Sequence, residues 1–78
     1  IIGFALETEN GEQEALKKLT NKNIDYIVLN YANEENAGFE SNTNHVYLYS
    51  KSGLKKEFKL DRKDRIAKQI IDSIIEND

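Results

Sequence analysis

Two nearly continuous apolar runs constrain the fold of this chain more than any other feature. Ile1 to Leu6 is apolar on both sides of the pleat apart from Gly3, and Ile24 to Leu29 is again rich in β-branched and aromatic residues. Runs of this kind are typical of central strands that helices cover on both faces. We therefore expect two strands inside an α/β layer structure.

The segment between these runs predicts a short amphipathic helix from Gly11 to about Lys22. Its apolar stripe consists of Ala15, Leu16 and Leu19. Asn10 followed three positions later by Gln13 resembles a capping box. A strand, a helix and a second strand form a β-α-β unit, so we expect a right-handed crossover and a parallel strand pair.

The second half opens with a polar, turn-forming stretch from Tyr31 to Thr43, which predicts a long loop. Val46 to Tyr49 and Lys56 to Leu60 then alternate apolar and polar residues on either side of a Lys-Ser-Gly turn at 51–53. This pattern predicts a β-hairpin with one solvated face. The lysines expected on that face are Lys55, Lys56 and Lys59.

The last segment predicts a helix that Asp61 caps, with Asp64 three residues further on. Its wide stripe, which must pack on the sheet, consists of Ile66, Ala67, Ile70, Ile71, Ile74 and Ile75. The fold class expected is therefore α/β, in the order β-α-β-loop-β-β-α. We interpret it as a Rossmann-like three-layer fragment in which a hairpin extends a parallel strand pair.

Charge and composition argue against several classes of function. The net charge of -3 and isoelectric point near 5.1 argue against a nucleic-acid or anionic-membrane surface. With no cysteine and one histidine, the chain cannot build a disulfide framework, a thiolate nucleophile or a His-rich metal site by itself. No apolar run approaches the roughly 20 residues that cross a bilayer. We expect a soluble, cytoplasmic protein.

The length of 78 residues allows one domain with a modest core. The chain contains no methionine, and its first residues already have the composition of a strand. We therefore interpret residues 1–78 as a single fragment of a longer protein.

No complete catalytic constellation and no Gly-rich phosphate loop are visible in the sequence. Ligands of open α/β sheets bind beyond the carboxyl ends of parallel strands, here Phe4 to Thr8 and Leu29 to Asn33. Lys18 and Lys22 lie four apart on one helix flank, where ammonium groups can reach phosphates. Lysine stems that only run along an apolar edge are the simpler explanation of that spacing.

Other candidate residues also have structural explanations. Phe4 fits a core position, and Glu7 with Thr8 fits a helix cap. His45 fits a satisfied or exposed side chain better than a general base. For Asn30, a turn contact and a substrate contact are equally good interpretations.

Gly3 to Thr8 resembles the Gly-Phe-Ala-x-Glu-Thr motif of the phosphopantothenoylcysteine synthetase family, often fused to a flavin-dependent decarboxylase. The similarity continues in order over essentially the whole chain. Its later parts are Lys18, Lys22 to Asp25, Ile27 to Asn30, Gly38 to Asn44 and the isoleucine-rich helix. The fragment therefore resembles the C-terminal half of the synthetase domain.

This resemblance implies a ligase that joins 4'-phosphopantothenate to cysteine in coenzyme A synthesis. CTP with Mg²⁺ would activate the pantothenate carboxylate as an acyl-cytidylate. Carried over by position, the resemblance implies nucleotide contacts for Phe4, Lys18 and Lys22, and no catalytic or metal-binding residue in this fragment. It also implies a homodimer, and FMN only in a fused upstream decarboxylase.

Further positions match parts of the family that would shape the site: Glu7, Thr8, Asn30, Phe39 and Asn44. Two departures occur, because family members commonly have an acidic residue where Asn42 stands and an Asp where Tyr31 stands. The family's Ser-Ser-Gly segment and Lys-x-Lys-Lys flap are absent from this chain. We expect half of a nucleotide site, and no activity from the fragment alone.

Two other classes of function stay open. A non-catalytic interaction or dimerisation domain would use the hairpin and sheet surface for self-association, with its lysines merely solvated. A receiver-like or anion-binding module would need an acidic cluster or a Gly-rich loop at a strand end, and the sequence has neither. Nucleotide-dependent thermal stability separates the ligase from both.

Overall fold

The computed structural model describes residues 1–7, 9–31 and 43–77. In chain order, its elements are β1 (Ile2–Glu7), α1 (Gly11–Asn21), β2 (Tyr26–Tyr31), β3 (Thr43–Ser50), β4 (Lys55–Arg62) and α2 (Lys63–Asn77). The predicted order of strands and helices is confirmed. Most of the predicted loop after Tyr31 lies outside the described residues.

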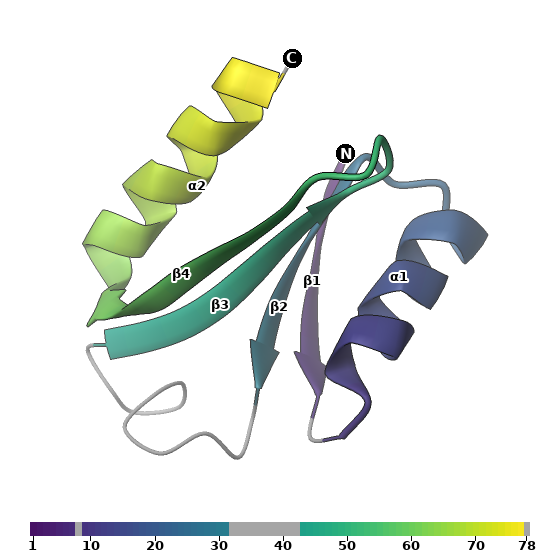
Figure 1. Ribbon diagram of the computed structural model, residues 1–78, viewed down its shortest axis with the longest axis horizontal. Coiled ribbons are helices and arrows are strands. Elements are labelled where there is room, and N and C mark those ends of the chain that lie inside the picture. Colours follow the sequence, from purple (N-terminus) through teal and green to yellow (C-terminus); the bar gives the residue numbers. More distant parts are fainter. Residues whose placement is uncertain (8, 32–42, 78) are drawn as a thin grey trace.

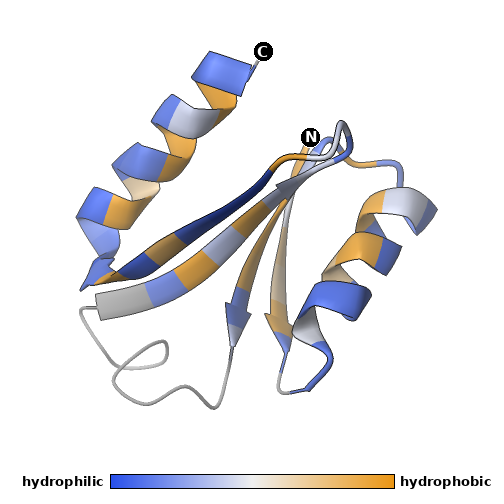
Figure 2. Ribbon diagram, viewed as in Figure 1, coloured by the Kyte–Doolittle hydropathy of each residue, from blue (hydrophilic) through white to orange (hydrophobic). Residues whose placement is uncertain are grey.

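The four strands form one sheet in the order β1-β2-β3-β4 (Figure 1). β1 and β2 are parallel, with Ile2 opposite Tyr26 and Glu7 opposite Tyr31. β3 is antiparallel to both β2 and β4, so the hairpin extends the parallel pair as predicted. In β4, the hydrophobic residues Phe58 and Leu60 alternate with hydrophilic ones after a start of three hydrophilic residues (Figure 2). This alternation is the pattern that predicted a half-solvated strand.

The two helices lie on opposite faces of the sheet, which confirms the predicted three layers (Figure 1). α1 packs against β1, β2 and β3, whereas α2 packs over β3 and β4. Neither helix of the described part is long and apolar enough to span a membrane.

We call the face under α1 the closed face. Ala15 and Leu19 of α1 are buried there. The buried sheet residues of the same cluster are Ala5, Ile27, Leu29 and Tyr49. Because α1 follows β1 directly and leads into β2, most of this core is built by contacts within one β-α-β unit, and β3 adds Tyr49.

We call the α2 side of the sheet the open face. Its core is formed by the buried residues Tyr26, Val28, Val46, Leu48, Phe58 and Ile66. Lys56 Nζ donates to Ser73 Oγ at 3.0 Å, and Asn77 Nδ2 donates to the Tyr26 hydroxyl at 3.1 Å, so polar bonds also fix α2 on the sheet. α2 does not extend over β1.

The prediction that helices cover β1 on both faces is therefore wrong for the described chain. Phe4 and Leu6 project from β1 on the open face and are 77% and 65% exposed. The physical reason is topological. α2 follows an antiparallel hairpin, so it lies over β3 and β4, near the edge of the sheet opposite β1.

The predicted capping box at α1 is also wrong. Asn10 has a left-handed backbone, with φ 52° and ψ 34°, and its side chain forms no cap hydrogen bond. A capping side chain needs an extended backbone at this position to reach the first free N–H groups. Instead, Glu12 and Glu14 in the first turn and Lys18 in the last turn complement the helix dipole.

Two further boundaries differ from the sequence prediction. β2 begins at Tyr26 rather than Ile24, after Asn23 with its positive φ of 50°. Asp61 belongs to β4 and not to the start of α2. Its Oδ1 accepts a hydrogen bond from the backbone N–H of Arg62 at 2.7 Å, and Arg62 precedes α2. The predicted α2 stripe is also too wide, because Ile71 and Ile75 are exposed.

Candidate functional site

Both helices begin at the same end of the sheet, where the parallel strands β1 and β2 end (Figure 1). β1 and β2 end side by side at Glu7 and Tyr31, and α1 begins soon after β1. Because β4 runs parallel in direction to β2, with antiparallel β3 between them, α2 also begins at this end. Ligands of open α/β sheets bind here.

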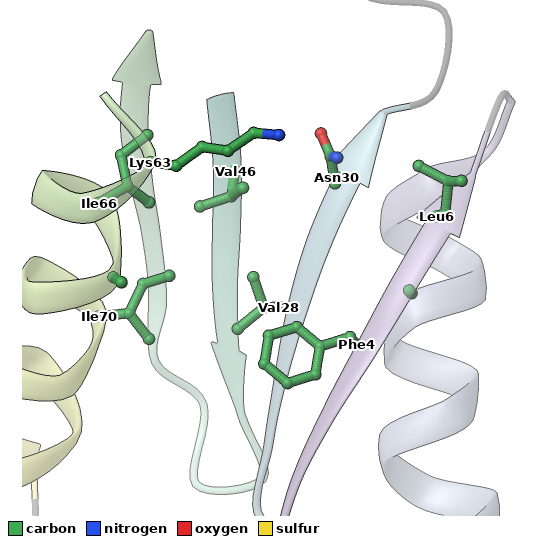
Figure 3. A pocket seen from close by; sticks show the side chains of 10 residues that line it. Phe4, Leu6, Val28, Asn30, Val46, Lys63, Ile66 and Ile70 are labelled. Atoms are coloured by element: carbon green, nitrogen blue, oxygen red, sulfur yellow. The ribbon is translucent and has the colours of Figure 1, made fainter. Parts of the chain in front are cut away.

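A groove of about 390 Å³ lies on the open face between β1 and α2 (Figure 3). Its apolar walls include Phe4 and Leu6 from β1, Val28 from β2 and Ile70 from α2. The volume falls in the range of roughly 300 to 1,000 Å³ that is typical of small-molecule sites. The groove therefore has the size and the apolar lining of a ligand site.

Two polar side chains, Asn30 and Lys63, also line this groove (Figure 3). Asn30 Oδ1 is buried and has no hydrogen-bond partner among the described residues. Lys63 forms no ion pair with a described residue, whereas the neighbouring Arg62 pairs with Asp64 at 2.7 Å. The groove thus contains a hydrogen-bond acceptor and a cation that have no partner in the described part of the chain.

Lys18 lies on the other side of β1, where it pairs with Glu7. Lys18 Nζ donates to Glu7 Oε2 at 2.8 Å, and the two side chains are 36% and 19% exposed. Glu7 points toward α1 because alternate residues of a strand face the same side, and Ala5 is buried under α1. The pair fixes an ammonium group near the carboxyl end of β1.

Lys22 lies about one turn beyond Lys18, at the C-cap of α1, and is exposed. The side chain of Phe4 faces the open-face groove, whereas Lys18 and Lys22 belong to the helix on the closed face. The structure therefore does not place these three side chains in one pocket of the described chain. Their nucleotide contacts stay a prediction.

Several other predicted positions lie outside the described residues. These are Thr8, Phe39 and the side chain of Asn44. No group of three or more His, Cys, Asp or Glu that could hold a metal occurs among the residues that the structure describes.

Two ion pairs lie on the closed side of the hairpin. Glu12 Oε1 lies 2.6 Å from Lys55 Nζ, and this hydrogen bond lowers the pKa of Glu12. His45 Nε2 lies 2.7 Å from Glu57 Oε2, and this hydrogen bond lowers the pKa of Glu57. Burial raises the pKa of the Tyr49 hydroxyl above its usual range. These ion pairs link α1 to β4 and β3 to β4.

Lys63 is a charged groove residue that the sequence did not suggest. In the sequence it stands inside a mixed run of Asp, Arg and Lys that is typical of a solvated helix start. The available signal was topological: a helix that follows the last strand of an antiparallel hairpin begins at the carboxyl end of the parallel pair.

Residues 1–77 match the family described as the DNA/pantothenate metabolism flavoprotein C-terminal domain. The chain belongs to this family. A solved structure of the family, the C-terminal domain of the coenzyme A biosynthesis bifunctional protein CoaBC, agrees with a TM-score of 0.76 at 38% sequence identity. That match covers 99% of this chain and 35% of the solved one, so it confirms the α/β arrangement.

Curated relatives of the family cover nearly all of this chain. CoaBC of Bacillus subtilis (strain 168) is 39% identical over 74 residues, which are 95% of this chain and 18% of that protein. CoaBC of Escherichia coli (strain K12) is 35% identical over 75 residues, which are 96% and 18%. A cysteine/cysteine sulfinic acid decarboxylase from an unknown prokaryotic organism is 40% identical over 75 residues, 96% and 21%. The chain spans about a fifth of each relative.

Proposed function

We propose that this chain is the C-terminal part of a ligase of coenzyme A biosynthesis, and that it contributes part of the nucleotide site. The ligase joins 4'-phosphopantothenate to cysteine through an acyl-cytidylate. Membership of the flavoprotein C-terminal domain family supports this proposal, as does the similarity to two CoaBC proteins whose names state coenzyme A biosynthesis.

The observation that carries the nucleotide assignment is the Lys18–Glu7 pair at the carboxyl end of β1. A cation held there lies where open α/β sheets bind their ligands. In the proposed site, Lys18 and the more exposed Lys22 neutralise phosphate charge, and such fixed cations also stabilise the charge that develops when pyrophosphate leaves. The exposed ring of Phe4 is available for contact with the nucleotide.

Magnesium would enter this site with CTP rather than as a resident ion. The described residues supply no cluster of metal ligands, and Mg²⁺ is commonly held by substrate phosphates with few protein ligands. FMN is proposed only for a separate, fused decarboxylase domain. No step assigned to the present residues uses it.

The remaining partners follow from the same proposal. The parent ligase would bind 4'-phosphopantothenate and cysteine largely through parts outside this chain, act as a homodimer and work in the cytoplasm. The present residues bind and orient the nucleotide. The fragment alone would have little activity, because it would hold only half of the site.

The test is a pair of titrations with CTP and Mg²⁺, one on the 78-residue chain and one on the parent ligase. The parent is then assayed for pyrophosphate release with phosphopantothenate and cysteine. Strong binding and release by the parent, with weak binding by the chain, support the half-site. If the parent neither binds CTP nor releases pyrophosphate, the ligase assignment fails.

Point variants of the parent test the individual contacts. Lys18→Ala and Lys22→Ala should raise the CTP requirement severely without changing the fold, because each removes a cation from the phosphate site. Lys17→Ala is the matched control, since Lys17 pairs with Glu14 at 3.9 Å on the exposed side of α1. Unchanged kinetics in Lys18→Ala and Lys22→Ala would remove the nucleotide assignment.

A second candidate is a non-catalytic interaction domain. It is favoured by the apolar side chains that β1 exposes, namely Ile2, Phe4 and Leu6. Contiguous apolar surface of this kind marks interaction sites as well as ligand sites. Self-association of the parent without any effect of CTP on its thermal stability would favour this second function.

A further inference from the structure

The amide of Asn30 is a polar group that the described chain leaves unsatisfied. A buried carbonyl oxygen without a donor costs about 1–3 kcal/mol, and nearly all buried polar atoms of native proteins have a partner. Asn30 Oδ1 has none among the described residues. The side chain is half-buried and lines the groove, and the terminal torsion of Asn is broad, so a turn of the amide brings its oxygen to the groove.

Lys63 is a cation in a position that disfavours it. It is the first residue of α2, where the helix dipole and the free N–H groups favour a negative charge. The other cations of this helix start are paired, Arg62 with Asp64 at 2.7 Å and Arg65 with Asp61 at 3.8 Å. Lys63 has no such partner in the described chain and lines the groove instead. An anion in the groove would satisfy both the ammonium group and the helix start.

These requirements describe one kind of ligand. Oδ1 of Asn30 needs a hydroxyl or N–H donor, the exposed ammonium group of Lys63 can pair with an anionic group, and the exposed ring of Phe4 offers a flat apolar surface. A ribonucleotide carries a base, sugar hydroxyls and phosphates in that order. An aliphatic acid would match the anion and the donor, but it would leave the aromatic face unused.

We propose that Asn30 and Lys63 form a nucleotide subsite on the open face, in which Asn30 accepts a hydrogen bond from a ribose hydroxyl and Lys63 pairs with phosphate. This inference rests on the proposed function and adds two residues to it. It also explains how Phe4 and Lys18 serve one ligand from opposite sides of β1: the phosphates extend over the carboxyl end of that strand, from Lys63 toward Lys18.

The cation is tested in the parent ligase with Lys63→Ala. The dissociation constant for CTP with Mg²⁺ should rise about tenfold, which is typical of one lost charge-assisted hydrogen bond. Lys68→Ala is the matched control, because Lys68 is an exposed lysine of the same helix that does not line the groove. Its dissociation constant should not change.

The amide is tested with Asn30→Leu and two nucleotides, CTP and 2'-deoxy-CTP. The native ligase should prefer the ribonucleotide, and the variant should lose most of that preference. Leucine has nearly the shape of asparagine and removes an unsatisfied oxygen, so the thermal midpoint without ligand should stay equal or rise. A purely structural role of Asn30 would lower that midpoint and leave the preference unchanged, which would overturn its part in the proposal.

Lys18→Ala, measured in parallel, separates this inference from the function on which it rests. If Lys18→Ala weakens CTP binding while Lys63→Ala does not, the open-face subsite is wrong and the ligase assignment stands. If neither variant changes CTP affinity, the nucleotide site itself fails. If Lys63→Ala raises only the KM for phosphopantothenate, the groove binds the acid substrate, and the nucleotide subsite is overturned.

Discussion

The closed and open faces of the sheet differ in how completely the described chain buries their apolar side chains and pairs their polar groups. Under α1, Leu29 is fully buried and Lys18 has a carboxylate partner. On the other face, Leu6 is 65% exposed, and neither the oxygen of Asn30 nor the ammonium group of Lys63 has a partner among the described residues. The same sheet thus has a closed core on one face and an open groove on the other.

This difference follows from the distance along the sequence over which each face is built. The closed face belongs to a β-α-β unit, in which the helix joins the two strands that it covers. α2 is separated from β1 by the whole hairpin and covers the far strands. A helix that directly joins two strands covers both of them. The part of the open face that α2 does not cover remains available to a ligand or to another protein segment.

The sharpest test of this comparison sets two leucines against each other. Leu29→Ala removes a fully buried side chain of the closed face and should lower the free energy of unfolding by about 3 kcal/mol, from lost burial and the cavity left behind. Leu6→Ala on the open face should lower it by less than about 0.5 kcal/mol, as is usual for exposed sites. Urea unfolding of both variants measures the two values. Equal losses would show that the open face is covered in solution.

A second test concerns how tightly α1 is packed. A methyl group at Gly11 would lie 2.6 to 2.8 Å from the outer ring carbons and the hydroxyl oxygen of Tyr31, so Gly11→Ala forces the ring or the helix to move. We expect a loss of about 1–3 kcal/mol, typical of overpacking, even though alanine is the better helix former. Gly3→Ala is the control, because the atom closest to its methyl group, at 2.6 Å, is the flexible tip of Ile24. If both variants lose the same stability, close packing of α1 at Tyr31 is not the cause.

Most of the fold could be predicted because its signals are local. The two apolar runs, the helical stripe around Ala15 and the turn at Gly53 each lie within a few residues, and the elements they predict are all present. Gly53 has a positive φ of 108°, which glycine adopts without strain. The capping box failed because the same Asn10 side chain is also compatible with a left-handed backbone, and the sequence does not choose between the two.

The site was less predictable, because it depends on which face a strand residue presents and on what covers that face. Phe4 in an apolar run is typical of a core position, yet it is exposed, since no helix of the described chain lies over it. The approach of Lys63 to the groove of Phe4 and Asn30 depends on the direction of β4. Residue spacing contains no information about that convergence.

A third prediction concerns the held cation of the closed side. Glu7→Gln in the parent ligase keeps the size of the side chain but removes the charge that holds Lys18, so we expect the dissociation constant for CTP to rise about threefold, below the effect of Lys18→Ala. Glu14→Gln serves as the control, because Glu14 pairs with the exposed Lys17 at 3.9 Å. A lower dissociation constant for CTP in Glu7→Gln would mean that the carboxylate repels phosphate more than it helps by positioning the lysine.

The smallest expected effect is a pH dependence at the edge of the closed side. The hydrogen bond from His45 lowers the pKa of Glu57 below its usual 4.5 in the folded protein. Its stabilising contribution is therefore present above about pH 4.5, and it is lost as the pH falls through the lower folded value. Glu57 is 40% exposed, so water screens the pair and the contribution is small.

Urea midpoints of the native chain and of Glu57→Gln, followed from neutral to acidic pH, measure this contribution. The variant should be slightly less stable near neutrality, and the two curves should converge in acid, because the carboxylate that distinguishes them is then protonated. Glu76→Gln is the control, since Glu76 is exposed and has no ion pair among the described residues. A constant difference at all pH values would assign the effect to packing of the Glu57 side chain. In that case the His45–Glu57 pair would add no pH-dependent stability to the closed side.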